Sequence, residues 1–167
     1  PAILGQADLV LVTVKSGATE EMGGLIANHA PPGATIVSLQ NGLTNAATLR
    51  QSLPGRLVLA GMVPFNVVAR GEGRFHRGTS GHILIDDAPD VSALLSVPHL
   101  PVEGHPDMEG VLAGKLLLNL NNALNALSGL TLYEQLGDRR WRNLLASCQE
   151  EALAVFRAAG VEPWSMG

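Results

Sequence analysis

A near-continuous apolar run at residues 7–14, rich in β-branched side chains, is the feature that most constrains the fold. Such a run is typical of a strand buried on both faces of a parallel sheet. After it, strand-like and helix-like segments alternate. The expected order is a helix over 16–29, a strand over 34–39, a helix over 45–52 and a strand over 57–60. Consecutive strand–helix units predict an open, mostly parallel α/β sheet.

The pattern changes after residue 60. Glycines separate short strands expected at 62–68, 73–77 and 81–86, and a short helix at 89–97 and an edge strand at 100–102 follow. Beyond Pro106 the pattern predicts only helix, over 107–128, 131–136 and 138–159. We therefore expect a Rossmann-like sheet domain over 1–104 and an all-helical domain over 105–167.

Composition narrows the function classes. A net charge of −4 argues against a nucleic-acid or anionic-membrane partner, and 46% hydrophobic residues indicate a well-cored globular protein. The single cysteine, Cys148, excludes an intrachain disulfide and a cysteine zinc cluster. We expect no membrane span and no signal peptide, a cytoplasmic location, and, because the sequence lacks an initiator Met, a piece of a longer protein.

Lys115 lies in the apolar segment 111–124, with Asn119 and Asn122 four and seven residues later. On a helix these three side chains fall within about 60° of one another. A buried ammonium is costly, and burial lowers its pKa, so it can donate a proton near neutral pH. The alternative is a lysine that extends to solvent along its own stem, beside solvated asparagines.

Two loops that follow strands are further candidates, because open sheets bind ligands at the carboxyl ends of their strands. Lys15 could meet an anionic ligand, although a solvent-facing lysine is the simpler interpretation of that loop alone. Asn41 and Gly42 suit close contact with a ribose or carboxamide, but Asn-Gly is also a common turn. His76 is a weaker candidate, since a lone strand histidine is more often structural. No histidine spacing suggests a metal site.

Four short motifs, in order, resemble the ketopantoate reductase (2-dehydropantoate 2-reductase) family. They are Val12-Thr13-Val14-Lys15, Val37-Ser38-Leu39-Gln40-Asn41-Gly42, the glycine-rich stretch from His76 to Gly81, and Lys115-Leu116-Leu117-Leu118-Asn119 followed by Asn122. The resemblance implies a Rossmann domain that binds NADP and a helical domain, with the active site in the cleft between them.

The resemblance also implies roles for individual residues. Lys15, Asn41 and Gly42 would serve the cofactor, Lys115 would be the catalytic lysine that hydrogen-bonds the keto oxygen, and Asn119 would bind the substrate. The family usually has a second asparagine four residues after the first and then a proline. Here Ala123 and Leu124 stand there, so either Asn122 substitutes or the choice of substrate differs.

The implied reaction is NADPH-dependent reduction of 2-dehydropantoate, or a similar 2-keto acid, to the 2-hydroxy acid in pantothenate biosynthesis. A related β-hydroxyacid dehydrogenase is an alternative, because such enzymes also carry a Lys and an Asn on one helix. A non-catalytic NADP-binding or assembly module is another alternative. Broad apolar helix faces make a homodimer possible. The family's glycine-rich cofactor loop would lie upstream of Pro1, and its late serine and glutamate beyond Gly167.

Overall fold

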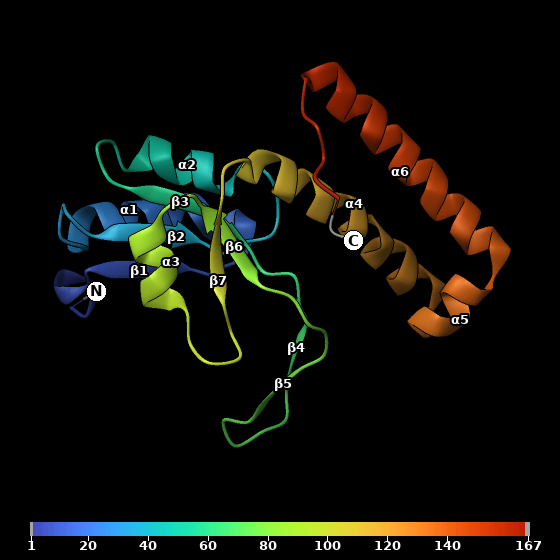
Figure 1. Ribbon diagram of the computed structural model, residues 1–167, viewed down its shortest axis with the longest axis horizontal. Coiled ribbons are helices and arrows are strands. Elements are labelled where there is room, and N and C mark those ends of the chain that lie inside the picture. Colours follow the sequence, from blue (N-terminus) through green and yellow to red (C-terminus); the bar gives the residue numbers. More distant parts are fainter. Residues whose placement is uncertain (1, 166–167) are drawn as a thin grey trace. The chain divides into compact units, whose positions relative to one another are not determined.

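The computed structural model describes residues 2–165 of the chain. The chain divides into two compact units, Pro1–Met108 and Glu109–Gly167. The first contains all of the described strands and the second is helical (Figure 1). Among the described residues, no helix is long and apolar enough to cross a membrane.

The first unit is built on a mostly parallel sheet with the strand order β1-β2-β3-β6-β7 (Figure 1). Its strands are β1 (Leu9–Val12), β2 (Thr35–Ser38), β3 (Val58–Met62), β6 (Ile83–Asp86) and β7 (Val102–His105). The first three strands run parallel, and only the β3–β6 pair is antiparallel. The α/β architecture expected from the alternating pattern is therefore confirmed.

Helices cover both faces of this sheet. They are α1 (Thr19–His29) and α2 (Asn45–Ser52), which pack against each other, and α3 (Pro89–Leu95), which packs against β7. Short 3-10 turns, η1 (Leu4–Gln6) and η2 (Ser16–Ala18), precede β1 and α1. Neighbouring residues Ile36 and Val37 are both fully buried but belong to different apolar clusters, one on each face. This is why β2 reads as a continuous apolar run.

Strand β1 differs from the expectation of burial on both faces. It is shorter than the apolar run, and Leu11 is 46% exposed whereas Val12 is 2% exposed. Val12 packs into the same apolar cluster as Ile26 of α1 and Leu49 of α2. No comparable cover lies over Leu11 among residues 2–165, so the prediction holds for one face of β1 only.

The glycine-rich part forms a separate two-stranded antiparallel sheet of β4 (Val67–Ala69) and β5 (Phe75–Arg77). Strand β7 begins later than expected because Val97 and Leu100 bridge across a tight turn in which His99 has a φ of 68°. Leu100, which the apolar pattern assigned to an edge strand, therefore lies in this turn instead. The described hairpin strands are exposed along their whole length.

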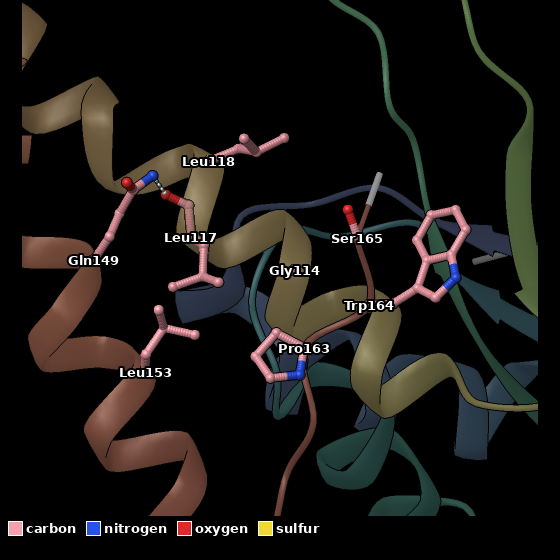
Figure 2. A pocket seen from close by; sticks show the side chains of 8 residues that line it. All are labelled: Gly114, Leu117, Leu118, Gln149, Leu153, Pro163, Trp164 and Ser165. Atoms are coloured by element: carbon pink, nitrogen blue, oxygen red, sulfur yellow. Dashed lines mark hydrogen bonds between the residues drawn. The ribbon is translucent and has the colours of Figure 1, made fainter. Parts of the chain in front are cut away.

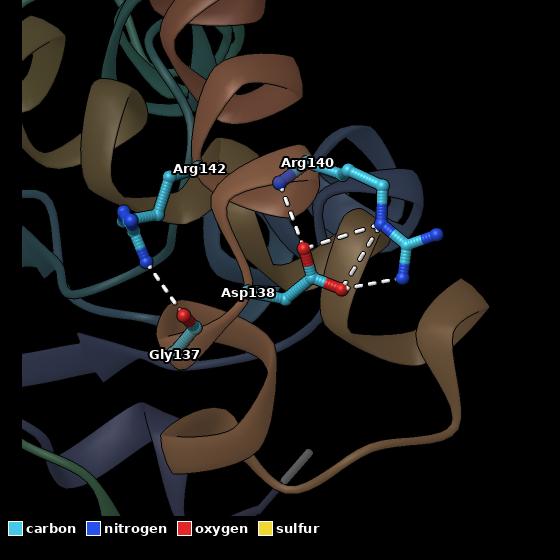
Figure 3. Close-up of polar contacts among 4 residues, drawn as sticks. All are labelled: Gly137, Asp138, Arg140 and Arg142. Carbon is cyan, nitrogen blue, oxygen red and sulfur yellow. Dashed lines mark hydrogen bonds and ion pairs between the residues drawn. The ribbon is translucent and has the colours of Figure 1, made fainter.

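The second unit contains α4 (Met108–Ser128), α5 (Leu132–Gly137) and α6 (Arg139–Ala159). The expected capping by Asp138 is confirmed: its carboxylate accepts the backbone N–H of Arg140 at 2.8 Å (Figure 3). Hydrogen bonds from the Arg140 side chain lower the pKa of this carboxyl. Gly160, expected to stop α6, adopts a φ of 73°, which a residue with a Cβ rarely takes.

Candidate functional site

The loops after β1 and β2 meet at the carboxyl edge of the sheet. Lys15 follows β1, and Asn41 and Gly42 follow β2, its parallel neighbour. The hydroxyl of Ser16 donates to the carbonyl oxygen of Asn41 at 3.1 Å, so the two loops are in direct contact. All three candidate residues are exposed to solvent. The structure thus brings Lys15, Asn41 and Gly42 into one region of the first unit.

Gly42 has the positive φ, 108°, that its place in an Asn-Gly turn predicts. A Cβ at this position would lie 3.3 Å from the side-chain nitrogen of Asn45 and 3.8 Å from the hydroxyl of Ser16. The turn therefore needs glycine for its backbone conformation and for the space beside two polar groups. The Lys15 ammonium makes no ion pair or hydrogen bond within residues 2–165, so it is available to an anion.

A buried polar network lies beneath these loops, and the sequence patterns did not single it out. Thr19, Gln40 and Asn45 are each no more than 6% exposed. The Thr19 hydroxyl donates to Oδ1 of Asn45 at 2.9 Å and accepts from Nε2 of Gln40 at 2.8 Å. Thr19 and Asn45 are the first residues of α1 and α2, where polar residues are common, so no local signal marked them out.

The network ends on the backbone of the two loops. Nε2 of Gln40 donates to the carbonyl oxygen of Val14 at 3.0 Å, and Nδ2 of Asn45 donates to that of Asn41 at 2.8 Å. Ser38 donates to Oε1 of Gln40 at 3.0 Å. Each of these buried amides is thus satisfied on both its donor and its acceptor side, as a stable buried network requires.

In the second unit, Lys115, Asn119 and Asn122 all lie on α4. At about 100° per residue they share one helix face, as expected. Lys115 is partly buried, and this burial lowers the pKa of its ammonium from the ordinary value of 10.5. Asn119 is partly buried and Asn122 is exposed. Within the described residues the Lys115 ammonium has no hydrogen-bond or ion-pair partner.

The other asparagines of α4 have a structural task. Asn125 donates to Oε1 of Gln135 at 2.8 Å, and Nε2 of Gln135 donates to Oδ1 of Asn121 at 2.8 Å. Gln135 is fully buried, so these bonds fix α5 against α4. Asn121 and Asn125 are four residues apart and turn away from the Lys115 face, which leaves that face to Asn119 and Asn122.

A groove of about 490 Å³ lies between α4, α6 and the segment after α6 (Figure 2). Its lining residues are Gly114, Leu117, Leu118, Gln149, Leu153, Pro163, Trp164 and Ser165. The backbone N–H of Trp164 donates to the carbonyl oxygen of Gly110 at 2.9 Å. A Cβ on Gly114 would lie only 2.1 Å from the carbonyl oxygen of Trp164. The segment that follows α6 therefore packs directly against the backbone of α4 at Gly110 and Gly114.

Metal chemistry finds no support in the described part of the chain. No group of three or more His, Cys, Asp or Glu side chains is arranged to hold a metal ion there. His76 lies on the exposed strand β5, where it is paired in register with Val68 of β4.

Burial of Lys115 gives a prediction with a defined sign. Both the folded and unfolded chains carry the charged amine below the lowered pKa, so the desolvation penalty is complete there. The penalty disappears as the pH rises from the lowered pKa toward 10.5. Lys115→Met should therefore raise the melting temperature at pH 7 by about a degree or two, and the gain should shrink near pH 10. Scanning calorimetry across pH measures this, with exposed Lys15→Met as the control; a lower melting temperature for Lys115→Met at pH 7 would contradict it.

A mostly parallel sheet with helices on both faces and polar loops at its carboxyl edge places the first unit in the class of Rossmann-like α/β domains. The chain belongs to the ketopantoate reductase PanE/ApbA family, whose model matches residues 1–90. The resemblance noted in the sequence motifs is therefore confirmed.

Solved and curated relatives agree with this assignment. The chain is 31% identical to a PanE/ApbA family ketopantoate reductase from Ralstonia eutropha JMP134, with a TM-score of 0.87 over 99% of this chain and 56% of that one. It is 26% identical to the 2-dehydropantoate 2-reductase of Listeria innocua over 92% of this chain and 53% of that protein. It thus spans about half the length of these two relatives.

A more distant structure shares the fold alone. D-Mandelate dehydrogenase, solved in complex with NADH, is 18% identical, with a TM-score of 0.83 over 95% of this chain and 56% of that one.

Proposed function

We propose that this protein takes part in the NADPH-dependent reduction of 2-dehydropantoate, or a similar 2-keto acid, to the 2-hydroxy acid. The observation that carries the proposal is family membership over residues 1–90. The partly buried Lys115 on α4, whose pKa is lowered, gives independent support to the proposal, because the family match ends at residue 90. One NADPH and one proton are consumed for each keto group reduced, and NADP⁺ is released.

The first unit supplies the groups that would hold the cofactor. An exposed cation at Lys15, a carboxamide at Asn41 and a glycine turn at Gly42 fit an anionic dinucleotide with ribose and amide groups. When bound, the nicotinamide ring supplies the hydride. We assign cofactor binding to residues 1–104 and substrate binding to residues 105–167.

Lys115 would act on the oxygen of the keto group. Reduction at the carbonyl carbon builds negative charge on this oxygen, and an ammonium hydrogen-bonded to it stabilises that charge and then donates its proton. The neutral amine regains a proton from water. Because burial lowers the pKa of Lys115, proton donation near neutral pH is easier than from an exposed lysine. Such proton donation contributes about 10²–10⁴ in rate.

Asn119 and Asn122 would orient the substrate from the same helix face as Lys115. Their carboxamides can donate to the carboxylate of a 2-keto acid and accept from a hydroxyl. Asn122 is the more exposed of the two, so we assign it the part of the substrate farther from the reacting carbonyl. A homodimer stays a prediction.

The test is an assay of NADPH oxidation with the protein expressed from its complete reading frame. We expect turnover with 2-dehydropantoate. An aromatic 2-keto acid is the comparison substrate, because a structural neighbour is named D-mandelate dehydrogenase. Reduction of NADP⁺ by β-hydroxy acids, with no turnover of either 2-keto acid, would instead favour a β-hydroxyacid dehydrogenase. Binding of NADPH without any turnover would favour a non-catalytic module.

Removing the carboxamide of Asn119 should mainly weaken substrate binding. We expect Asn119→Ala to raise the KM for the keto acid about tenfold while kcat changes less, because the lost hydrogen bond is made in the ground state as well as the transition state. Steady-state kinetics measures the split. Asn143→Ala, at an exposed position on α6, is the matched control. An unchanged KM for Asn119→Ala would remove Asn119 from the substrate site.

A further inference from the structure

A buried network of polar side chains lies beneath the two loops of the first unit. Four of its side chains, Thr19, Ser38, Gln40 and Asn45, are at most 6% exposed, and burying polar groups is unfavourable unless every one is paired. Apolar side chains would fill the same space without that requirement. Its location, at the carboxyl edge of the sheet, is where open α/β proteins bind ligands.

The network holds the backbone on both sides of the candidate cofactor residues. Gln40 binds the carbonyl oxygen of Val14, directly before Lys15. Asn45 and Ser16 both donate to the carbonyl oxygen of Asn41, directly before Gly42. The accepting carbonyl oxygens thus belong to the residue before Lys15 and to Asn41 itself. The spacing between the two loops is thereby tied to side chains that do not themselves face solvent.

Thr19 is the connecting member. Within residues 2–165, its hydroxyl is the only group that bonds to both buried amides, as a donor to Asn45 and as an acceptor from Gln40. Gln40 anchors the β1 loop and Asn45 anchors the β2 loop, so Thr19 couples the two anchors. Buried, fully paired networks favour one discrete arrangement over the alternatives.

We infer that Thr19, Gln40 and Asn45 are positioning residues that set the spacing of Lys15 and Asn41 for the nicotinamide dinucleotide. The inference rests on the proposed function for the identity of the ligand. These residues touch neither cofactor nor substrate; they act through the loop backbone. The same network explains why the second loop has glycine at position 42, because a Cβ there would crowd the side chain of Asn45.

The test compares Thr19→Val with Thr19→Ser. Valine keeps the shape of the side chain but removes both hydrogen bonds, whereas serine keeps the hydroxyl. We expect amide hydrogen exchange of Leu39, whose backbone N–H donates to the carbonyl oxygen of Val12 at the base of the two loops, to be about tenfold faster in Thr19→Val, with no change at Ile36 and Val37 of β2. The dissociation constant for NADPH should rise about tenfold, and Thr19→Ser should restore both values to within about threefold of wild type.

The matched control is Thr48→Val on α2, whose hydroxyl donates to the carbonyl oxygen of Thr44, the residue before this helix, and bonds to no member of the network. It should leave exchange at Leu39 and NADPH affinity unchanged. If Thr19→Val does not fold, Ser16→Ala, at an exposed position, removes a hydroxyl that donates to the carbonyl oxygen of Asn41 and accepts from Nδ2 of Asn45. This variant should shift both readouts in the same direction by about threefold.

The outcomes separate the two claims. Faster exchange at Leu39 in Thr19→Val, together with a wild-type protein that binds no nicotinamide dinucleotide, would overturn the proposed function and leave the coupling of the loops standing. Wild-type exchange and wild-type NADPH affinity in a folded Thr19→Val variant would overturn the positioning role. Equal acceleration at Leu39 and at Ile36 and Val37 of β2 would also overturn it, because the effect would then be general destabilisation.

Discussion

Lys115→Ala is expected to lower kcat for 2-keto acid reduction by at least about 100-fold, with a much smaller change in KM. Alanine cannot stabilise charge on the keto oxygen or donate a proton to it, and these contributions are largest in the transition state. Steady-state kinetics on the protein expressed from its complete reading frame measures the effect. The position of the lysine fits this role, since within residues 2–165 its partly buried ammonium has no hydrogen-bond or ion-pair partner.

Two controls make this result specific. Lys115→Arg keeps the positive charge but is a poor proton donor, so it should recover little of the lost kcat. NADPH affinity should stay close to wild type in both variants, because the groups assigned to the cofactor lie in the first unit. A folded Lys115→Ala variant with wild-type kcat would remove the lysine from the chemistry.

Gly114→Ala should displace the segment that follows α6 and destabilise the second unit. A Cβ at this position would lie 2.1 Å from the carbonyl oxygen of Trp164, which is a backbone atom and cannot rotate away. We expect a loss of about 1–3 kcal/mol in the free energy of unfolding, typical of overpacking. Trp164 is 40% exposed, and its indole fluorescence should shift to longer wavelength as it becomes more exposed.

Gly24→Ala is the control for this substitution. Gly24 lies within α1 and nothing would contact an added Cβ there. Alanine is the better helix former, so this variant should be more stable than wild type by about 0.5–1 kcal/mol. Urea unfolding compares the two. An unshifted fluorescence spectrum and unchanged stability for Gly114→Ala would show that the segment after α6 does not pack against Gly114 in solution.

Much of the fold could be predicted from local sequence signals. Both faces of β2 are buried, so the sequence leading up to Ser38 is mostly apolar and predicted a strand. Gly160 predicted the end of α6 because the residue that ends a helix at a positive φ, here 73°, is usually glycine. The Asn-Gly turn at residues 41–42 and the shared face of Lys115 and Asn119 also followed from spacing alone.

The features that could not be predicted depend on contacts between distant segments. The network of Thr19, Gln40 and Asn45 joins residues 21 to 26 positions apart, and no local pattern distinguishes its members from ordinary polar residues in loops and helix starts. Gly114 reads only as a glycine in a helix, and its packing depends on where the chain returns fifty residues later. Leu11 shows the opposite case, where an apolar pattern overstated burial.

The most direct test of the proposed reaction follows the hydride itself. NADPH carrying deuterium at the transferable position of the nicotinamide ring is incubated with 2-dehydropantoate and the protein, and the 2-hydroxy acid is analysed by mass spectrometry. A deuteron on the carbon that bore the keto group is the predicted result. A 2-hydroxy acid without the label, or no 2-hydroxy acid from a protein that binds both ligands, would contradict the proposed reaction.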